Sequence, residues 1–282
     1  MQTIKIGEKR VPIIGLGSWH MGDDLRLKKQ EINSIKKGIE AGIAVIDTAE
    51  MYGEGNSELM LGEAINSLNR DNLYLISKVY PWNASKKQLP VSLDQSLERL
   101  GVDYLDLYLL YWRGSIPLEE TVEALEQAKQ AGKIRAWGVS NFDVADLEEL
   151  YSVPNGQYCA ANEVLYNLGS RGIEYDLLPW MQEHALPLIA YSPIAQGDTL
   201  GNEFQQQKIL QAIADNHHAT VFQILLAWTL RNNNTLAIPQ SSNSKHVIEN
   251  INAAEISLTE NELAEIDRIY PKPTKKQSLA ML

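Results

Sequence analysis

Short apolar runs alternate with longer amphipathic segments along the chain. The runs are rich in β-branched and aromatic residues and occupy positions 11–16, 44–47, 73–78, 104–110, 134–139, 159–164, 186–191 and 235–238. Between them, apolar residues recur at helical spacing at 28–41, 58–68, 91–100, 118–131, 144–150, 173–184, 219–231 and 245–253. Because strands that alternate with helices form parallel sheets, these eight repeats predict an α/β fold, a closed (β/α)8 TIM barrel.

Three features outside the repeats complete the expected architecture. The opening segment "IKIGEKRVPI" predicts a β-hairpin, and segments 203–216 and 259–270 predict additional helices. An open, doubly wound sheet is the alternative, but it would carry a G-x-G-x-x-G turn after its first strand, which "GLGSWHMG" does not match. No low-complexity linker divides the chain, so we expect residues 1–282 to form one domain.

Charge and cysteine content narrow the class of protein. The chain has 25 Lys and Arg against 36 Asp and Glu, a net charge of −11, which disfavours binding to a nucleic-acid backbone. A single cysteine, Cys159, excludes an intrachain disulfide and favours a reducing compartment. No apolar window approaches the roughly 18 residues of a membrane span, and the histidines lack metal-ligand spacing. We therefore expect a cytoplasmic monomer without membrane, nucleic-acid or metal partners.

Polar side chains follow the predicted strands, at the edge where a parallel barrel places its active site. They are Asp47 with Tyr52 in the next loop, Lys78, Tyr111, Ser140 and Asn141, Asn162 and Glu163, Tyr191 and Ser192, and Gln240, Ser241 and Ser242. We expect these side chains to meet around one pocket.

Asp47, Tyr52 and Lys78 carry the clearest chemistry in this set. Asp47 and Lys78 end adjacent strands, so their charges can pair and offset the cost of burial. The lysine would lower the pKa of Tyr52 from about 10, because a cation favours the phenolate. Such a tyrosine can give a proton to a developing alkoxide, which indicates carbonyl reduction with hydride from another group. Position alone leaves open an ordinary salt bridge beside a surface tyrosine.

The segment "AIPQSSNSKHVIENINA" follows the eighth strand and leads into a helix. Backbone N–H groups at this helix start, with Ser241, Ser242 and Asn243 beside them, can hold a phosphate, as TIM-type barrels often do here. Simple capping of the helix by a Ser/Asn-rich turn explains the same residues.

Over almost its full length the chain resembles the aldo-keto reductases. The motifs "IDTAEMYG", "ISKV", "SLERLGVDYLDLYLL", "GKIRAWGVSNF", "AYSP" and "IPQSSNSKHVIEN" carry this resemblance by their order and spacing. The segments "GSWHMGDD", "SKVYPWNAS" and "YNLGSRGIEYDLLPW" resemble a bacterial branch that includes methylglyoxal-reducing enzymes.

The resemblance implies an NADPH-dependent enzyme and assigns a role to each site residue. Tyr52 would be the proton donor, tuned by Asp47 and Lys78. The residues expected to contact the cofactor are Ser140, Asn141, Glu163, Tyr191, Ser192, Pro193, Ile194, Gln196, Gln240, Ser241, Ser242, His246, Glu249 and Asn250. The residues expected to line the substrate pocket are Trp19, Trp82 and Trp112.

Four positions depart from the family pattern. Tyr111 stands where histidine is usual, so its phenol either donates the hydrogen bond that orients the substrate carbonyl or blocks the pocket. Glu163 replaces a glutamine, and its carboxylate would place negative charge close to the nicotinamide and so favour the oxidised ring. Gln240 and His246 replace a lysine and an arginine, which removes fixed positive charge from the expected 2′-phosphate site. We therefore predict a weakened preference for NADPH, with NADH or dual use.

Two functions follow from this pattern. The first is a working NAD(P)H-dependent reductase of small aldehydes, ketones and 2-oxoaldehydes such as methylglyoxal, which the trio Asp47, Tyr52 and Lys78 favours. The second is a catalytically weak relative that binds the cofactor and works as a sensor or scaffold, which the four departures favour.

Overall fold

A parallel eight-stranded sheet forms the centre of the computed structural model, which describes residues 2–195 and 201–282. Its strands are β3 (Leu16–Gly17), β4 (Val45–Asp47), β5 (Tyr74–Val79), β6 (Leu105–Leu110), β7 (Ile134–Ser140), β8 (Asn162–Leu165), β9 (Leu188–Tyr191) and β10 (Thr235–Ala237). Each strand pairs with the next in chain order, and a parallel bridge between Ile14 and Ala237 joins the last strand to the segment before the first. The expected (β/α)8 barrel is therefore confirmed.

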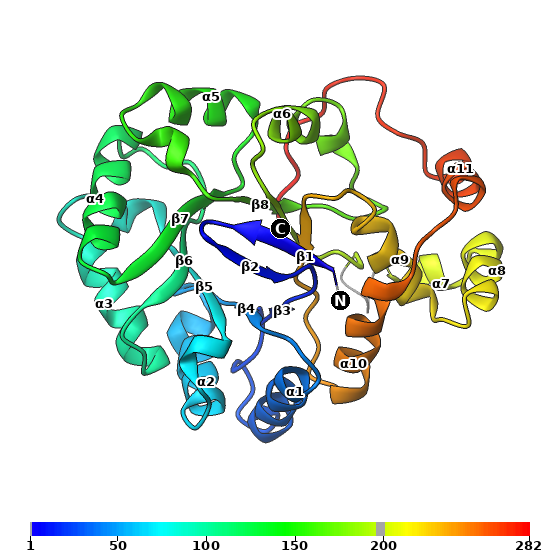
Figure 1. Cartoon of the computed structure of the whole chain (residues 1–282), viewed down its shortest axis with the longest axis horizontal. Coiled ribbons are helices and arrows are strands. Elements are labelled where there is room, and N and C mark those ends of the chain that lie inside the picture. Colours follow the sequence, from blue (N-terminus) through cyan, green and yellow to red (C-terminus); the bar gives the residue numbers. More distant parts are fainter. Residues whose placement is uncertain (1, 196–200) are drawn as a thin grey trace.

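Helices surround this sheet in the order that the repeats predicted (Figure 1). They are α1 (Lys28–Glu40), α2 (Asn56–Ile65), α3 (Leu89–Leu100), α4 (Leu118–Gln130), α5 (Val144–Ser152), α6 (Leu177–Glu183), α9 (Val221–Thr229) and α10 (Ser244–Asn252). The additional helices α7 (Gly201–Gln205), α8 (Lys208–Asn216) and α11 (Glu260–Ile269) lie outside this ring. The segment expected as one helix over 203–216 is thus two, which meet near Gln206 and Gln207.

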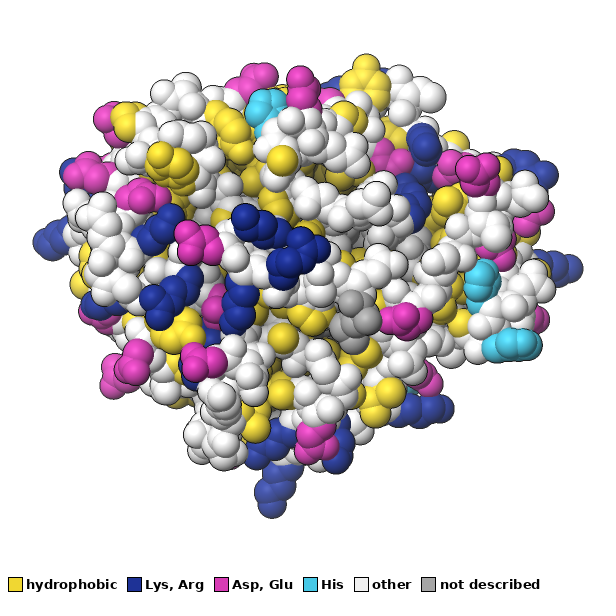
Figure 2. All heavy atoms as spheres, viewed as in Figure 1, with side chains coloured by type: hydrophobic (Ala, Val, Ile, Leu, Met, Phe, Trp, Pro, Cys, Tyr) yellow, Lys and Arg dark blue, Asp and Glu magenta, His cyan; other side chains and the backbone are white. Residues whose placement is uncertain are grey.

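The expected hairpin consists of β1 (Thr3–Ile6) and β2 (Lys9–Pro12) and covers the amino ends of the barrel strands (Figure 1). The hydroxyl of Tyr74, the first residue of β5, donates a hydrogen bond to the carbonyl of Ile6. Residues 11 and 12 belong to this hairpin, so the first barrel strand is shorter than the predicted run 11–16. Seen from this side, Lys and Arg side chains gather over the hairpin, which contributes Lys5, Lys9 and Arg10 (Figure 2).

Side chains alternate across the sheet and fill two apolar layers. Leu107 and Leu109 of β6 belong to the cluster inside the barrel, whereas Tyr108 and Leu110 belong to the cluster beneath the helices. This alternation follows from the two-residue repeat of a strand. No helix in the described ranges 2–195 and 201–282 is long and apolar enough to cross a membrane.

Candidate active site

Five ionisable side chains lie at the carboxyl ends of the barrel strands, on the face that points into the barrel. Val45, Ile76, Leu109, Ala161 and Ile189 all belong to the interior apolar cluster. Two residues further along each chain segment stand the ionisable groups Asp47, Lys78, Tyr111, Glu163 and Tyr191. Residues two apart on a strand share a face, so all five side chains are directed to the carboxyl end of the barrel interior. This local register is why these five predicted groups meet, whereas the Asn162 side chain, also expected there, bonds to the backbone of Phe142 instead.

The ammonium group of Lys78 is the centre of the site. It donates hydrogen bonds to both carboxylate oxygens of Asp47, each at 2.7 Å, and to the Thr48 carbonyl at 2.9 Å. The Tyr52 hydroxyl lies 3.1 Å from it, and Glu163 Oε1 lies 3.3 Å away on the other side. Asp47, Lys78 and Glu163 are each only 1% exposed. One buried cation therefore faces two buried carboxyl groups and one phenol.

Burial and charge act in opposite directions on the lysine of this cluster. Burial lowers the pKa of Lys78, but the negative charges of Asp47 and Glu163 outweigh it and hold the pKa above its usual value. Burial raises the pKa of Asp47, while the ammonium of Lys78 opposes that change. For Glu163 the burial effect dominates, and the charge of Asp47 raises its pKa further. Lys78 stays charged across the physiological range.

The expected lowering of the Tyr52 pKa is wrong. Burial and the charge of Asp47 raise the pKa of this phenol well above its usual value, and Tyr111 and Glu163 add to the shift. In the resting site, burial and the neighbouring acidic groups outweigh the effect of the nearby lysine charge on this phenol. Tyr52, which is 7% exposed, is therefore a neutral hydroxyl in the resting site.

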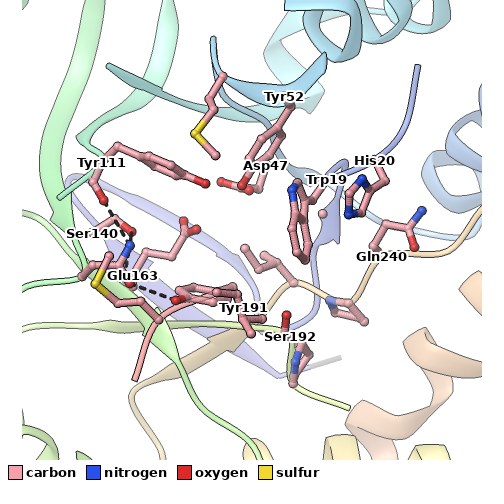
Figure 3. Close-up of a pocket in the computed structure, with 18 of the residues that line it drawn as sticks. Trp19, His20, Asp47, Tyr52, Tyr111, Ser140, Glu163, Tyr191, Ser192 and Gln240 are labelled. Atoms are coloured by element: carbon pink, nitrogen blue, oxygen red, sulfur yellow. Dashed lines mark hydrogen bonds between the residues drawn. The ribbon is translucent and has the colours of Figure 1, made fainter. Parts of the chain in front are cut away.

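Tyr111 brings a second phenol to the same point. Its ring meets that of Tyr52 edge to face, with centroids 6.3 Å apart. Burial raises the pKa of Tyr111, although Lys78 opposes this shift. Figure 3 shows its hydroxyl directed toward Asp47 and Tyr52.

Hydrogen bonds lock the opposite wall of the site. Tyr191 donates its hydroxyl proton to Asn141 Oδ1 at 2.9 Å, and Asn141 Nδ2 donates to the Tyr111 carbonyl at 3.1 Å (Figure 3). Ser140 Oγ donates to the Glu163 carbonyl at 2.9 Å. Asn141 has a φ of 58°, in the left-handed region that asparagine tolerates better than most residues. These bonds fix the positions of the side chains around the cavity.

A cavity of about 530 Å³ opens above these groups (Figure 3). The predicted site residues that line it are Trp19, Asp47, Tyr52, Tyr111, Trp112, Ser140, Asn141, Glu163, Tyr191, Ser192, Pro193, Ile194 and Gln240. Lys78 lies beneath its floor. A cavity of this size accommodates a small organic ligand.

Several predicted residues lie away from this cavity. Trp82 is 61% exposed, stacks on Tyr80 and meets Trp112 with ring centroids 5.7 Å apart at the rim. Ser241, Ser242, His246, Glu249 and Asn250 lie at the start of α10 or along it and do not line the cavity. Gln196 lies outside the described residues.

The turn before α10 caps the helix. Asn243 Oδ1 accepts a hydrogen bond from the Lys245 N–H at 2.9 Å, and Ser241 Oγ accepts one from the Asn243 N–H at 3.1 Å. The capping expectation is therefore confirmed. His246 is exposed on the first turn, and Lys245 lies 3.6 Å from Glu249. The phosphate site at this turn stays a prediction.

The end of the chain lines the cavity as well, which was not expected from the sequence. Met281 and Leu282 reach it from the end of the chain, more than ten residues beyond α11. Lys276 holds this segment by ion pairs with Asp143 at 2.6 Å and Asp176 at 2.8 Å. The partners are 133 and 100 residues distant in sequence, so no local pattern marks this segment as part of the site.

The barrel and the charged cavity at the carboxyl ends of its strands are features of a (β/α)8-barrel enzyme. The model of the aldo/keto reductase family matches residues 13–271, and the chain belongs to that family. The protein is therefore an NAD(P)H-dependent oxidoreductase.

Individual relatives are similar over nearly the whole chain. Methylglyoxal reductase YeaE of Escherichia coli (strain K12) is 47% identical over 276 residues, which are 98% of this chain and 97% of the relative. Glyoxal reductase of Bacillus subtilis (strain 168) is 32% identical and covers 93% of this chain and 92% of its own length. The crystal structure of an aldo/keto reductase from Klebsiella pneumoniae, in complex with NADP and acetate, is 48% identical. It has a TM-score of 0.97 and covers 100% of this chain and 99% of its own.

Proposed function

We propose that the protein reduces small aldehydes and 2-oxoaldehydes, such as methylglyoxal, to alcohols, with Tyr52 as the proton donor. The observation that carries this proposal is the neutral Tyr52 hydroxyl, held 3.1 Å from Lys78 at the floor of an organic-ligand cavity. The relatives named as methylglyoxal and glyoxal reductases support the substrate class.

The residues of the floor favour proton transfer to a carbonyl oxygen. A reduced nicotinamide held in this cavity would supply a hydride to the carbonyl carbon, which would leave a strongly basic alkoxide oxygen on the substrate. Tyr52 keeps its proton in the resting site, because burial and the nearby carboxyl groups raise its pKa. Once the proton has moved to the alkoxide, Lys78 stabilises the resulting phenolate by its charge and by the hydrogen bond at 3.1 Å, with the Tyr111 ring packed edge to face beside it.

The side chains on the cavity wall fit a nicotinamide group. The Tyr191 ring offers a flat face for stacking, and the amide of Asn141 and hydroxyl of Ser140 lie beside it. Glu163 Oε2 is buried there and makes no hydrogen bond within the described part of the chain. A buried oxygen without a hydrogen-bond partner lowers the stability of the folded state, so a nicotinamide carboxamide beside Glu163 Oε2 would supply the missing partner. Ser140, Asn141, Glu163 and Tyr191 are therefore the proposed nicotinamide contacts.

Consumption of NADPH with methylglyoxal tests the function. We expect the purified protein to oxidise NADPH in proportion to added methylglyoxal and to form hydroxyacetone or lactaldehyde, measured by absorbance at 340 nm and chromatography of the product. An aromatic aldehyde such as benzaldehyde serves as a second substrate for the apolar wall of Trp19 and Trp112. Binding of NADPH without turnover of any aldehyde would contradict the proposal and favour the sensor.

Tyr111 separates the two candidate functions. Its hydroxyl sits beside that of Tyr52 and leaves the cavity open, which favours a donor to the substrate oxygen over a block. For a working enzyme, Tyr111→His should change the ratio of kcat/KM between methylglyoxal and benzaldehyde more than it changes kcat. For a sensor, the same substitution should raise kcat from near zero.

The adenosine end of the cofactor site predicts a modest preference between NADPH and NADH. Gln240 and His246 replace permanently charged side chains, and the nearby Lys245 lies beside Glu249. We expect NADPH to bind less than about 100-fold more tightly than NADH, because a bidentate Arg–phosphate pair is missing. Titration of tryptophan fluorescence with each cofactor measures the ratio. His246→Arg should raise the preference for NADPH, and a ratio above 100-fold in the unsubstituted protein would contradict the expectation.

A further inference from the structure

The cluster below the cavity contains one carboxyl group more than its cation can balance. Lys78 contacts Asp47 through two hydrogen bonds of 2.7 Å, but it reaches only one oxygen of Glu163, at 3.3 Å. If both carboxyls were ionised, a net negative charge would stand in a site that is 1% exposed, with Glu163 Oε2 unpaired. A buried, uncompensated charge is usually removed by protonation.

The position of Lys78 identifies the carboxyl group that holds the proton. Lys78 donates hydrogen bonds to both oxygens of Asp47 at 2.7 Å, whereas it lies 3.3 Å from a single oxygen of Glu163. The other oxygen of Glu163 has no hydrogen-bond partner within the described part of the chain. Because the cation favours an ionised Asp47, Glu163 is the carboxyl group that holds the proton; burial and the charge of Asp47 raise its pKa in the same direction.

We propose that Glu163 is the proton store of this site: it is a neutral acid when the cavity is empty or holds a reduced nicotinamide, and it ionises when the ring becomes the oxidised cation. The inference rests on the proposed nicotinamide contacts. The ring of NADP⁺ adds a second positive charge to the cavity that Glu163 lines, so two carboxylates then face two cations. A carboxylate at this position would favour the oxidised ring over NADPH, whereas a neutral Glu163 does not oppose binding of the reduced cofactor.

The same arrangement balances the proton of carbonyl reduction. The substrate gains a hydride from the reduced nicotinamide and a proton from Tyr52, and its carbonyl becomes an alcohol. Lys78 lies 3.1 Å from Tyr52 and 3.3 Å from Glu163, so it can return a proton to the phenolate and regain one from Glu163. The O–H bond of Glu163 breaks, and the final state holds its carboxylate beside the newly cationic ring.

Other titratable groups face Glu163 and do not replace it in this role. They are Asp47 on β4, Tyr52 after it, Lys78 on β5, Tyr111 after β6 and Tyr191 on β9. The three phenols have pKa values raised by burial, and Lys78 has one held above its usual range. Near neutral pH none of these four changes its charge. His20 also lines the cavity, where it lies 2.9 Å from Asp23, and the Glu163→Gln comparison below separates a proton of the carboxyl pair from one of this imidazole.

Calorimetry in buffers of different ionisation enthalpy measures the proton directly. At pH 7.5, binding of NADP⁺ to the full chain should release close to one proton, whereas binding of NADPH should release none. Both cofactors carry the same 2′-phosphate, so their difference isolates the nicotinamide ring. The Kd for NADP⁺ should fall about tenfold per pH unit in the range where this proton is released, by proton linkage.

Glu163→Gln provides the decisive comparison, because the amide has the same shape and cannot ionise. We expect it to bind both cofactors, with the NADP⁺-linked proton lost and the pH dependence of Kd equal for the two. Glu31→Gln is the matched control: Glu31 is 3% exposed, burial raises its pKa, and it accepts a hydrogen bond from the Gly22 N–H, away from the cavity. On binding NADP⁺, the Glu31→Gln variant should release the same number of protons as the unsubstituted protein.

Thermal unfolding gives a readout without cofactor. A carboxyl with a raised pKa in the folded state binds more protons folded than unfolded, so stability falls as pH rises above about 4.3, the unfolded value. The Tm advantage of Glu163→Gln should therefore grow with pH. If NADP⁺ and NADPH bind with the same proton release, the inference about Glu163 is overturned and the proposed reductase function is unaffected. If the proton is released but no aldehyde is reduced, the proposed reductase function fails and the inference about Glu163 stands.

Discussion

Replacing Tyr52 with phenylalanine should lower kcat for methylglyoxal reduction by about 10²–10⁴-fold, the usual contribution of a positioned general acid. The substitution removes the hydroxyl 3.1 Å from Lys78 and keeps the ring that fills the cavity floor. Lys78 retains its hydrogen bonds to Asp47 and Thr48, so the folded structure should persist with a stability loss of about 1 kcal/mol. Single-turnover oxidation of NADPH, monitored at 340 nm, measures the chemical step.

Two comparisons make this result specific to the hydroxyl. Tyr80→Phe removes a phenol at the rim, where the ring stacks on Trp82, and should leave kcat within about twofold. The Kd of NADPH for Tyr52→Phe should also be unchanged, which separates chemistry from binding. If turnover by Tyr52→Phe matches that of the unsubstituted protein, another group delivers the proton.

The position of the candidate site follows from local sequence features. The two-residue repeat of the strands places Lys78 with Ile76 and Tyr111 with Leu109, and the parallel order places their carboxyl ends at one mouth. Both rules need only the neighbouring residues and the alternation of elements. The barrel and the meeting of the polar strand ends were predictable for this reason.

The charge state of the site was not predictable in the same way. The expectation for Tyr52 counted the nearby cation alone, whereas the folded site adds burial, Asp47 and Glu163. Whether Lys78 lowers the pKa of a neighbour depends on how many carboxyl groups share its charge. The number of carboxyl groups near Lys78 depends on how closely β8 packs, because this packing brings Glu163 within 3.3 Å of Lys78. Such a distance between strands cannot be derived from the sequence pattern.

The end of the chain was missed for a different reason. Met281 and Leu282 reach the cavity through a segment with no helical or strand periodicity, and Lys276 fixes it by ion pairs with Asp143 and Asp176. A lone lysine in a polar segment gives no indication of its partners. The two aspartates directly precede α5 and α6. Only the packing of these helices in the folded protein brings the two carboxylates together around the lysine.

Replacing Lys78 with methionine should have the largest effect on stability. Methionine has similar length, but it leaves Asp47 buried without a cation, and removal of one partner of a buried ion pair costs about 3–5 kcal/mol. Asp47 and Glu163 would then both be protonated in the folded state. Since a raised carboxyl pKa makes the folded state bind extra protons, the destabilisation should grow as pH rises from 5 to 8. Urea unfolding at several pH values measures this trend.

The double variant Lys78→Met with Asp47→Asn distinguishes the charge imbalance from a loss of packing. Removing the carboxylate as well should recover much of the lost free energy of unfolding and flatten its pH dependence, because no buried charge is left unpaired in that contact. It should not restore turnover, since the phenolate of Tyr52 would still lack the cation that lies 3.1 Å away in the unsubstituted protein. If the single and double variants are equally unstable, Lys78 stabilises the barrel through packing of its methylene groups rather than through its charge. If the double variant recovers turnover, Lys78 has no part in the proposed chemistry.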